Sequence, residues 1–333
     1  MPINLRDALP LKVPLRVWID PTNVCNFKCT FCPTGDDELL KSVNRPKGFM
    51  TLETFKNAIN GLEEIVKKYN FKPIQISLYK DGEPLLNKDL PKMIKMLRDK
   101  NITDCVEITS NASALTEKNS REILNAGLQR IRFSVEHVSD EGYQKITQKK
   151  IPFKKIYENI KRFSEMNQSM GKPCFINTKI VNVNYPEEDI NKFKKLFTPL
   201  ADTAEIDYLH GWSDTEKKDF RLGSRENKSM GGDPLINRKV CPEPFSRLTI
   251  YFNGDASPCC VDWAHKLVVG NVNDMKMDEI WNGNRANEIR LYHLKHNIPK
   301  DSPCYSCQYM FGHPEYDSVD GQENRLLKEY KTI

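Results

Sequence analysis

The sequence predicts an α/β protein built on a parallel sheet and followed by a small α+β unit. Two patterns carry this prediction. Short apolar or β-branched runs alternate with longer amphipathic runs through residues 1–210, and such alternation is typical of a parallel sheet covered by helices. From Arg247 the chain changes to a hairpin pattern, a helical pattern and a group of cysteines. The alternation alone fits a doubly wound sheet and a barrel equally well.

Six segments of the first part have the composition of strands. They are residues 16–20, 74–79, 105–109, 130–135, 174–181 and 204–209. The segments between them include five with the spacing of amphipathic helices, at residues 51–69, 88–99, 116–126, 153–167 and 187–197. Thr51 and Thr116 stand where a side chain that caps a helix N-terminus is expected. Each of these helices is therefore expected to lie between one strand and the next.

The last part of the chain has a different organisation. Residues 211–240 are polar, rich in glycine and charge, and long for a loop, so they form either an interdomain linker or a loop that covers an active site. The Asn253-Gly254 pair between two strand-like runs predicts a β-hairpin with a type I′ turn. We expect one helix over residues 275–291 and a tail over residues 311–333 that ends in a helix.

Composition excludes several classes of protein. The chain has 333 residues, of which 39% are hydrophobic, and its net charge of +5 comes from 50 basic and 45 acidic side chains. This small, interleaved excess argues against a nucleic-acid partner. No apolar run approaches the ~20 residues that span a bilayer, and the N-terminus lacks a signal peptide, so we expect a cytoplasmic protein without membrane contact. Ten cysteines in a reducing compartment indicate metal or redox chemistry rather than disulfides.

The first group of cysteines follows the first expected strand. Cys25, Cys29 and Cys32 are spaced C-x3-C-x2-C, at the strand end where α/β proteins place their active sites. Three thiolates can hold three irons of a [4Fe–4S] cube and leave the fourth iron open. The alternative is a zinc site completed by a distant histidine. It is disfavoured because the first histidine of the chain is His137.

This motif resembles the signature of radical S-adenosylmethionine (SAM) enzymes, which is C-x3-C-x2-C with an aromatic residue, here Phe31, before the last cysteine. The resemblance implies a partial (β/α)6 barrel, similar to a TIM barrel, over residues 1–210. It also implies that the open iron chelates the methionine moiety of SAM. An electron from the cluster then cleaves SAM to methionine and a 5′-deoxyadenosyl radical, which abstracts a substrate hydrogen. The implied electron donor is a flavodoxin- or ferredoxin-type protein.

The stretch LYKDGEPLL after the second strand is similar to the GGEP motif of that family. The resemblance implies that the backbone at Gly82 approaches SAM closely and that Glu83 accepts a hydrogen bond from the methionine ammonium. Asp81 stands where relatives have the first glycine. A side chain at that position disfavours the same close approach of the backbone.

Two further strand ends carry matches to the family. ITSNAS stands where relatives often have TNG, which makes Ser110 and Asn111 candidates for contact with the ribose or methionine of SAM. FSVEH stands where relatives often have S-x-D-G, which makes Ser134 and Glu136 candidates for contact with the ribose or carboxylate. Lys179 on the fifth strand is a candidate to face the SAM carboxylate.

The second group of cysteines has the spacing C-x17-C-x44-C-x2-C, formed by Cys241, Cys259, Cys304 and Cys307. It resembles the auxiliary-cluster domains called SPASM and, in shortened form, twitch, and places such a domain at residues 241–310. No cysteine follows the fourth one, so a single auxiliary [4Fe–4S] cluster is expected. A four-cysteine zinc knuckle is the alternative. The spacing is nearest to that of the twitch dehydrogenase that oxidises an amino-cyclitol in butirosin biosynthesis. It differs from the molybdopterin-precursor cyclase, which has three auxiliary cysteines and a Gly-Gly end, whereas this chain ends in KTI.

Three cysteines remain. Cys260 is adjacent to Cys259, and the G-x4-C count from Gly254 favours Cys259 as the cluster ligand. Cys260 is then either a packing residue or a donor of a hydrogen atom to a substrate radical. Cys105 and Cys174 lie in expected core strands and are interpreted as packing residues.

The resemblance leaves three functions to compare. The first is oxidation (dehydrogenation) or epimerisation of a sugar-, cyclitol- or aminoglycoside-like small molecule, for which a base must remove an alcohol proton; Arg221, Arg225 and Arg247 lie in or beside the long loop. The second is epimerisation or crosslinking of a ribosomally made peptide, which is disfavoured because only residues 1–15 precede the first expected strand. The third, of another class, is a non-catalytic electron-transfer or zinc protein, which the SAM-site motifs disfavour.

Overall fold

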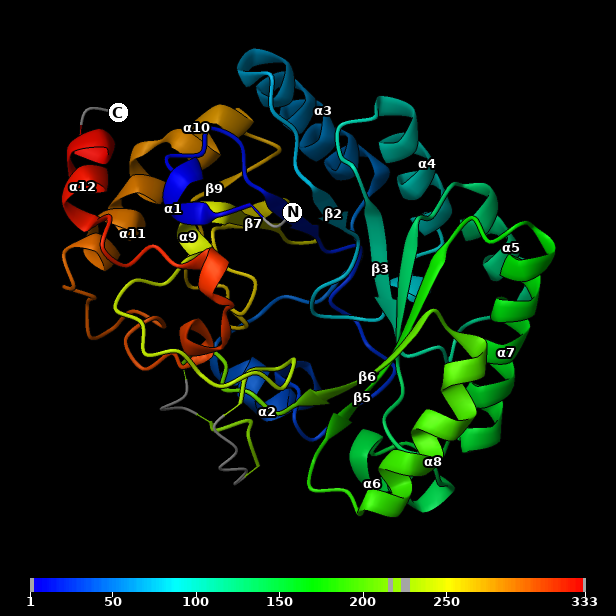
Figure 1. Cartoon of the computed structure of the whole chain (residues 1–333). Helices are drawn as coiled ribbons and strands as arrows, with labels where there is room; N and C mark the ends of the chain where they lie inside the picture. The colour runs from blue at the N-terminus through cyan, green and yellow to red at the C-terminus, as the bar shows by residue number, and fades with distance from the viewer. Residues whose placement is uncertain (1–2, 215–217, 223–227, 332–333) are drawn as a thin grey trace.

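A curved sheet of parallel strands forms the centre of the molecule (Figure 1). The computed structural model describes residues 3–214, 218–222 and 228–331. Six strands run parallel and pair in the order in which they occur along the chain. Their bounds are Arg16–Ile19 (β1), Gln75–Ser77 (β2), Val106–Ser110 (β3), Arg130–Ser134 (β4), Phe175–Asn182 (β5) and Thr203–Tyr208 (β6). The expected partial barrel of six parallel strands is confirmed, with strand bounds within two residues of those expected.

Helices cover the outer face of this sheet (Figure 1). The five that were expected are present, at Leu52–Tyr69 (α3), Leu90–Lys100 (α4), Glu117–Asn125 (α5), Phe153–Ser169 (α7) and Glu187–Phe197 (α8). The Thr51 hydroxyl accepts the N–H of Thr54 at 3.1 Å, and Thr116 forms a capping box with Asn119. Because these caps satisfy N–H groups that have no partner inside the helix, they fix where α3 and α5 begin.

Two short helices near the cysteine motif were not expected. α2 spans Asp37–Ser42 and α6 spans Asp140–Thr147. Both follow a polar cap, since the side chains of Asp36 and Ser139 accept N–H groups of the first turns. The caps are the sequence signal that could have revealed these helices. Each helix is too short for its apolar spacing to be distinctive.

The C-terminal strands continue the same sheet. β7 (Arg247–Ile250) pairs parallel with β1, while β8 (Asp255–Ser257) and β9 (Gly270–Asn271) add antiparallel strands beyond it. The order is therefore β6-β5-β4-β3-β2-β1-β7-β8-β9. Val17 of β1 and Leu248 of β7 belong to one buried core. The barrel and the C-terminal part are thus joined by main-chain hydrogen bonds as well as by side-chain packing.

The turn between β7 and β8 differs from the expectation. The hairpin is present, but the type I′ prediction is wrong, because that turn needs positive φ at both central residues and Asn253 does not have it. Gly254 alone is left-handed, with φ of +93°. Its N–H donates to Tyr251 O at 2.9 Å, and Tyr251 N–H donates to Asp255 O at 2.8 Å. The loop therefore has three residues and uses its glycine at the left-handed position.

The C-terminal helices pack beside the open end of the sheet (Figure 1). They are Glu243–Ser246 (α9), Met277–Asn282 (α10), Asn284–Leu294 (α11) and Glu323–Lys331 (α12). The single helix expected over residues 275–291 is wrong: the chain breaks at Gly283, where a Cβ atom would lie 2.1 Å from Glu279 O. The helix expected at the C-terminal end is present as α12.

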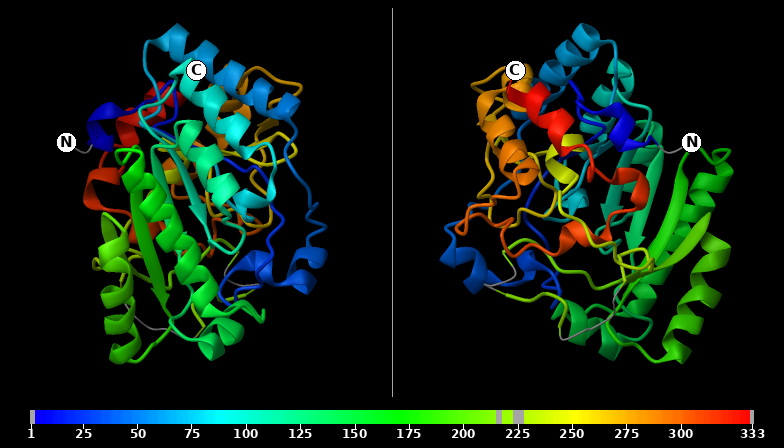
Figure 2. Two further views of the ribbon diagram at one scale, coloured as in Figure 1. Left: turned by 90° about the vertical axis from the view of Figure 1, so that its right-hand side faces the viewer. Right: turned by 60° about the vertical axis from the view of Figure 1, so that its left-hand side comes forward.

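Both ends of the described chain meet on this side of the molecule (Figure 2). Leu5 of α1 (Leu5–Ala8) and Leu326 of α12 share a second buried cluster, and the Arg325 guanidinium donates to Leu9 O at 2.8 Å. Short 3-10 helices complete the elements, at Pro33–Gly35, Pro84–Leu86, Thr198–Leu200, Tyr309–Gly312 and Glu315–Asp317. Within the described ranges, no helix is long and apolar enough to cross a membrane.

Candidate active site between two groups of cysteines

The three motif cysteines lie together in the loop that follows β1, and we call residues 24–35 the cysteine loop. The end of α6 holds this loop in place. The N–H groups of Lys28 and Thr30 donate to the carbonyl oxygens of Thr147 and Ile146, at 2.9 and 3.0 Å. These are carbonyls of the last turn of a helix, which has no intrahelical donors for them. α6 therefore positions the loop that carries Cys25, Cys29 and Cys32.

The cysteine loop is a tight turn that gathers thiols. Cys32 N–H donates to Cys29 O at 3.0 Å, and a Cβ atom on Gly35 would lie 2.5 Å from the same oxygen. Burial raises the pKa of Cys25 to about 12 and also raises the pKa values of Cys29 and Cys32. Three clustered thiols whose thiolates need a compensating charge are a donor set that suits iron. Phe31 lies on the same loop and is half-buried.

Glu83 connects the ends of β2 and β3. Its carboxylate accepts from the Ser110 hydroxyl at 2.8 Å, the Asn111 N–H at 2.7 Å and the Leu85 N–H at 3.1 Å. Burial raises the pKa of Glu83 to about 7. Three predicted SAM-site residues are therefore one hydrogen-bonded unit. Their contacts with SAM stay a prediction.

The backbone at Gly82 packs against the cysteine loop and the residues before it. A Cβ atom there would lie 2.2 Å from Thr22 O and 2.6 Å from Val24 O, and the next N–H, of Glu83, donates to Val24 O at 3.0 Å. The need for glycine at this position therefore comes from the close approach of two backbone segments. The expected approach of this backbone to SAM is a separate matter and stays a prediction.

Asn111 lies directly beside the first motif cysteine. Its Nδ2 atom is 3.9 Å from Cys25 Sγ and donates to Asn26 Oδ1 at 3.0 Å. Its Oδ1 atom accepts from the Ser113 hydroxyl at 2.6 Å, and Ser113 in turn accepts from Asn26. Asn26 and Ser113 were not singled out in the sequence. Asn26 is part of the cysteine motif itself, which is the one signal that pointed to it.

The remaining candidates lie on or just after β4 and on β5. Ser134 is opposite Lys179 in the strand register, and Glu136 is only 6% exposed. Burial raises the pKa of Glu136 to about 7, and nearby Lys179 opposes that rise. The Lys179 ammonium is bound to Asp207 Oδ2 at 2.8 Å. A role of Lys179 at the SAM carboxylate therefore competes with an existing ion pair.

A buried ionic network that the motifs did not reveal surrounds Asp81. Its carboxylate contacts Lys80 Nζ at 2.6 Å, His265 Nε2 at 3.0 Å and Arg45 Nη1 at 3.5 Å. Burial alone would raise the pKa of Asp81, but Arg45 and Lys80 hold it well below its usual value. His265 belongs to the loop between β8 and β9. Asp81, which stands where relatives have a glycine, therefore links the strand-end motif to the C-terminal part of the chain.

The four cysteines of the second group also meet in space. Cys241 precedes α9, Cys259 follows β8, and the other two cysteines follow α11. Cys304 and Cys307 lie close enough to Cys241 and to Cys259 to raise the pKa of each of those thiols. Burial is the largest cause of these raised pKa values. Cys304 Sγ also lies 3.6 Å from the Tyr292 hydroxyl. Four convergent thiols fit a cluster whose irons are all bound by protein.

Cys260 lies beside this group, within a second buried ionic network. Its N–H donates to Glu243 Oε2 at 3.1 Å, and its Sγ atom is 3.8 Å from the Tyr309 hydroxyl. Glu243 pairs with Arg247, which also binds Asp317 at 2.8 Å. Of the packing cysteines, Cys174 lies in the core, and Cys105 is half-buried.

Of the three arginines named as possible bases, Arg247 is buried and committed to these two carboxylates. Arg221 lies in residues 218–222 of the long loop and is partly exposed, and it binds Asp219 at 2.8 Å. Arg225 lies outside the described residues. The described part of the long loop does approach the site, because Lys218 borders a cavity of about 450 Å³ together with Cys29 and Cys32.

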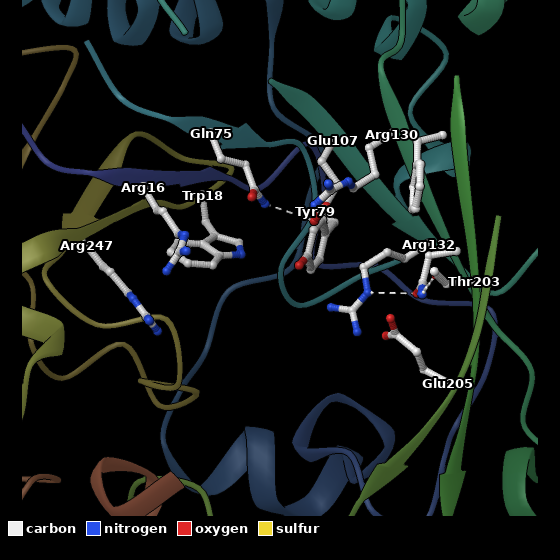
Figure 3. A pocket seen from close by; sticks show the side chains of 12 residues that line it. Arg16, Trp18, Gln75, Tyr79, Glu107, Arg130, Arg132, Thr203, Glu205 and Arg247 are labelled. Carbon is white, nitrogen blue, oxygen red and sulfur yellow. Dashed lines mark hydrogen bonds and ion pairs between the residues drawn. The ribbon is translucent and has the colours of Figure 1, made fainter. Parts of the chain in front are cut away.

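The interior of the barrel contains a second cavity, of about 400 Å³, which we call the lumen pocket (Figure 3). Side chains on or just after β1 to β7 line it: Arg16, Trp18, Gln75, Tyr79, Glu107, Arg130, Arg132, Phe175, Asn177, Thr203, Glu205 and Arg247. It is a polar chamber between the strands, and the cysteine loop and Glu83 follow the carboxyl ends of the same strands. A molecule inside it would lie below the candidate SAM site.

Comparison with known families agrees with this geometry. The model of the radical SAM superfamily matches residues 19–198, more than half of the chain. This chain belongs to the radical SAM superfamily. A second model, of the iron–sulfur cluster-binding domain called SPASM, matches residues 241–308. The chain is thus a radical SAM enzyme with a C-terminal SPASM domain, and its cofactors are SAM, a radical SAM [4Fe–4S] cluster and auxiliary iron–sulfur in the SPASM domain.

Among curated proteins, this radical SAM chain is similar to GTP 3′,8-cyclases. It is 29% identical to that of Staphylococcus epidermidis over 213 residues, or 60% of this chain and 57% of that protein. It is 35% identical over 127 residues to a probable GTP 3′,8-cyclase of Methanococcus maripaludis, or 38% of each chain. The chain therefore matches about two to three fifths of the length of these relatives.

Solved structures share the fold at low sequence identity. BtrN in complex with AdoMet and 2-DOIA is 20% identical with a TM-score of 0.53, over 92% of this chain and 98% of that one. Streptococcus suis SuiB bound to precursor peptide SuiA is 15% identical with a TM-score of 0.65, over 93% and 73%. The anSMEcpe protein with bound AdoMet is 16% identical with a TM-score of 0.60, over 96% and 100%. These likenesses support the radical SAM and SPASM fold.

Proposed function

We propose that this radical SAM enzyme oxidises or epimerises a sugar-, cyclitol- or aminoglycoside-like small molecule by abstracting one hydrogen atom from carbon. The SAM cluster, when bound and reduced, supplies the electron that converts SAM into methionine and a 5′-deoxyadenosyl radical. A flavodoxin- or ferredoxin-type protein is the proposed electron donor. The carrying observation is the lumen pocket, because a polar chamber of about 400 Å³ suits a small hydroxylated molecule.

In this proposal, the chain's own residues bind and orient the cofactor. Cys25, Cys29 and Cys32 hold the SAM cluster. Glu83, kept in place by Ser110 and Asn111, accepts from the methionine ammonium, and a bound ammonium would favour the ionised form of its carboxylate. Phe31, Gly82, Ser134, Glu136 and Lys179 complete the set of proposed contacts.

The second group of cysteines holds one auxiliary [4Fe–4S] cluster in this proposal, as in a twitch domain. Cys241, Cys259, Cys304 and Cys307 would bind all four of its irons, so this cluster accepts an electron or shapes the pocket rather than binding SAM. Cys260 is not among the residues that line the described lumen pocket. Its contacts with Glu243 and Tyr309 favour a packing role over hydrogen-atom donation.

Peptide modification is the second candidate function. SuiB bound to precursor peptide SuiA and anSMEcpe bound to the Cp18Cys peptide have TM-scores of 0.65 and 0.58 with this chain. This fold therefore accommodates peptides as well as the AdoMet and 2-DOIA found with BtrN. The small volume of the lumen pocket favours the small molecule.

Anaerobic reconstitution tests the proposed cofactors. The wild-type chain is expected to bind about eight irons, in two [4Fe–4S] clusters, and a triple alanine variant of Cys25, Cys29 and Cys32 about four. Reduction in the presence of SAM is expected to release 5′-deoxyadenosine from the wild type alone. Iron analysis, electron paramagnetic resonance and chromatography of the nucleoside measure these outcomes.

The triple alanine variant is also the control, because its SPASM cysteines are intact. Stoichiometric zinc in place of iron would contradict both cluster assignments. A fully reconstituted chain that releases no 5′-deoxyadenosine under reduction would contradict the proposed reaction.

A further inference from the structure

The lumen pocket has a cationic wall built from β1 and β7. Arg16 is the first residue of β1 and lies opposite Arg247 in the parallel register of β7. Figure 3 shows both side chains on the same side of the pocket, with the Trp18 ring beside them. The centre of the Arg247 guanidinium lies 5.8 Å from the centroid of that ring. Two guanidinium groups therefore face one chamber.

Most arginines of the pocket are bound to protein acceptors. Arg130 lies 3.6 Å from Glu107, Arg132 lies 3.5 Å from Asp207, and Arg247 pairs with Glu243 and Asp317. Arg16 differs from them. Within the described residues it has no side-chain hydrogen bond or ion pair, and only a longer-range attraction reaches it from Asp317.

The second arginine of this wall, Arg247, offers no free donor to the chamber. The Nε atom of Arg247 is fully buried and has no hydrogen-bond partner among the described residues, and the whole Arg247 residue is only 7% exposed. Because a fully buried atom has no surface that a molecule in the chamber can contact, Arg16 is the donor of this wall that remains for a ligand. The planar fork of the Arg16 guanidinium matches the oxygens of a carboxylate or phosphate.

The opposite wall of the lumen pocket offers an acceptor. Glu205 on β6 points into the pocket across from Arg16 (Figure 3). Its carboxylate has no hydrogen bond or ion pair within the described ranges of the chain, so it is available to substrate hydroxyls. The pocket therefore has a cationic end and a hydroxyl-binding side, which is the pattern that an acidic sugar requires.

We infer that the substrate carries a carboxylate or phosphate group, which binds to Arg16 in the lumen pocket while the rest of the molecule extends toward the cysteine loop. β1 runs from Arg16 toward that loop, and the four residues to Asp20 span roughly 13 Å at about 3.3 Å each. The rest of the substrate must span about this distance to place a carbon near the strand ends. This inference rests on the proposed function, since it assigns one end of its substrate.

Calorimetry on the reconstituted enzyme with SAM, under anaerobic conditions, tests the inference. The probes are inorganic phosphate, glucuronate, glucose 6-phosphate and glucose. At least one anionic probe is expected to bind at least tenfold more tightly than glucose, and Arg16→Met is expected to remove that preference, about tenfold or more. If glucuronate binds most tightly, the anionic group of the substrate is a carboxylate. If the phosphates bind most tightly, it is a phosphate. Arg16→Lys, which keeps the charge, is expected to lose less.

Arg285→Met is the charge-matched control, because Arg285 is exposed on α11 and pairs only with Glu288 within the described residues. It is expected to bind the probes as the wild type does. Anionic probes that bind no better than glucose, or a preference that survives Arg16→Met in folded, iron-loaded protein, would overturn the inference. Release of 5′-deoxyadenosine by the Arg16 variants separates this result from the proposed function, because SAM cleavage without substrate does not need Arg16.

Discussion

The Glu83 side chain fixes the relative positions of several residues of the candidate SAM site. Two of the groups that it binds, the Ser110 hydroxyl and the Asn111 N–H, belong to a different strand end, and Asn111 in turn touches Cys25. The sequence motifs identified Glu83, Ser110 and Asn111 as separate candidates. Their hydrogen bonds mean that a change at one of them alters the position of the others.

His293 on α11 provides a pH-dependent contribution to stability at one residue. It is 1% exposed, and neither ring nitrogen has a partner among the described residues. Burial lowers its pKa to about 4. The folded protein therefore binds fewer protons here than the unfolded chain, and stability is lost as the pH falls from about 6.5 toward 4.

The variant His293→Leu is expected to remove this loss. The lowered pKa of His293 corresponds to about 3 kcal/mol of unfolding free energy that the wild type loses across that interval. Relative to the wild type, the variant should gain stability progressively as the pH is lowered. Melting temperatures of both proteins from pH 7 to pH 4.5 measure the difference. A constant difference across this range would contradict a neutral buried imidazole.

At the scale of the elements, the turn of the cysteine loop requires glycine at position 35. A Cβ atom on Gly35 would lie 2.5 Å from Cys29 O and 2.9 Å from Lys28 C, both backbone atoms. Gly35→Ala must therefore shift the turn that gathers the thiols. The reconstituted variant is expected to keep the auxiliary cluster and lose the SAM cluster, which leaves about four irons in place of about eight. Iron analysis with paramagnetic resonance measures the loss.

Gly231→Ala is the matched control for that change. A Cβ atom on Gly231 meets nothing closer than Ser229 Oγ at 4.0 Å. This control is expected to hold the iron content of the wild type. Full iron content in Gly35→Ala would mean that the loop tolerates the displacement.

The elements that the sequence revealed are those with long repeating patterns. The five outer helices have apolar spacing over 9 to 18 residues, the six short strands alternate regularly with them, and Thr51 and Thr116 mark helix starts by local chemistry. The missed features depend on short segments or on contacts between distant ones. α6 has only eight residues, and at Gly283 the helix ends in an extended backbone so close to Glu279 O that no Cβ atom would fit, which appears only in three dimensions.

The candidate site divides in the same way. The cysteines and the strand-end residues follow motifs, so the sequence revealed them. Arg16 could not be selected from the sequence, because its significance depends on the register of β1 with β7, across an interval of more than two hundred residues. The same holds for His265, whose contact with Asp81 joins a strand end to the loop between β8 and β9.

At the scale of the whole molecule, the network around Asp81 joins the barrel to the SPASM domain. Arg45 and Lys80 are buried beside this carboxylate, and Arg45 also donates to Trp263 O at 2.8 Å. Asp81→Gly restores the usual family residue but removes the carboxylate that both buried cations contact and leaves them beside the buried Asp20 alone. It is expected to lower the unfolding free energy by about 3–5 kcal/mol, seen as a lower melting temperature of the holoenzyme.

Asp104→Gly is the control for this loss of a carboxylate, because the Asp104 side chain is 57% exposed and pairs with Lys72 on the surface. Its melting temperature is expected to change little, as exposed ion pairs contribute about 0–1 kcal/mol. Equal melting temperatures of the two variants would mean that the buried network contributes no more than a surface pair.

The parallel pairing of β7 with β1 has one further consequence. An uncovered β1 would present a row of free N–H and C=O groups at the side of the barrel, and such edges recruit strands from other molecules. β7 occupies that row along all four residues of β1. The antiparallel strands beyond it end in β9, an edge of only two residues. The SPASM domain therefore also protects the barrel from edge-to-edge aggregation.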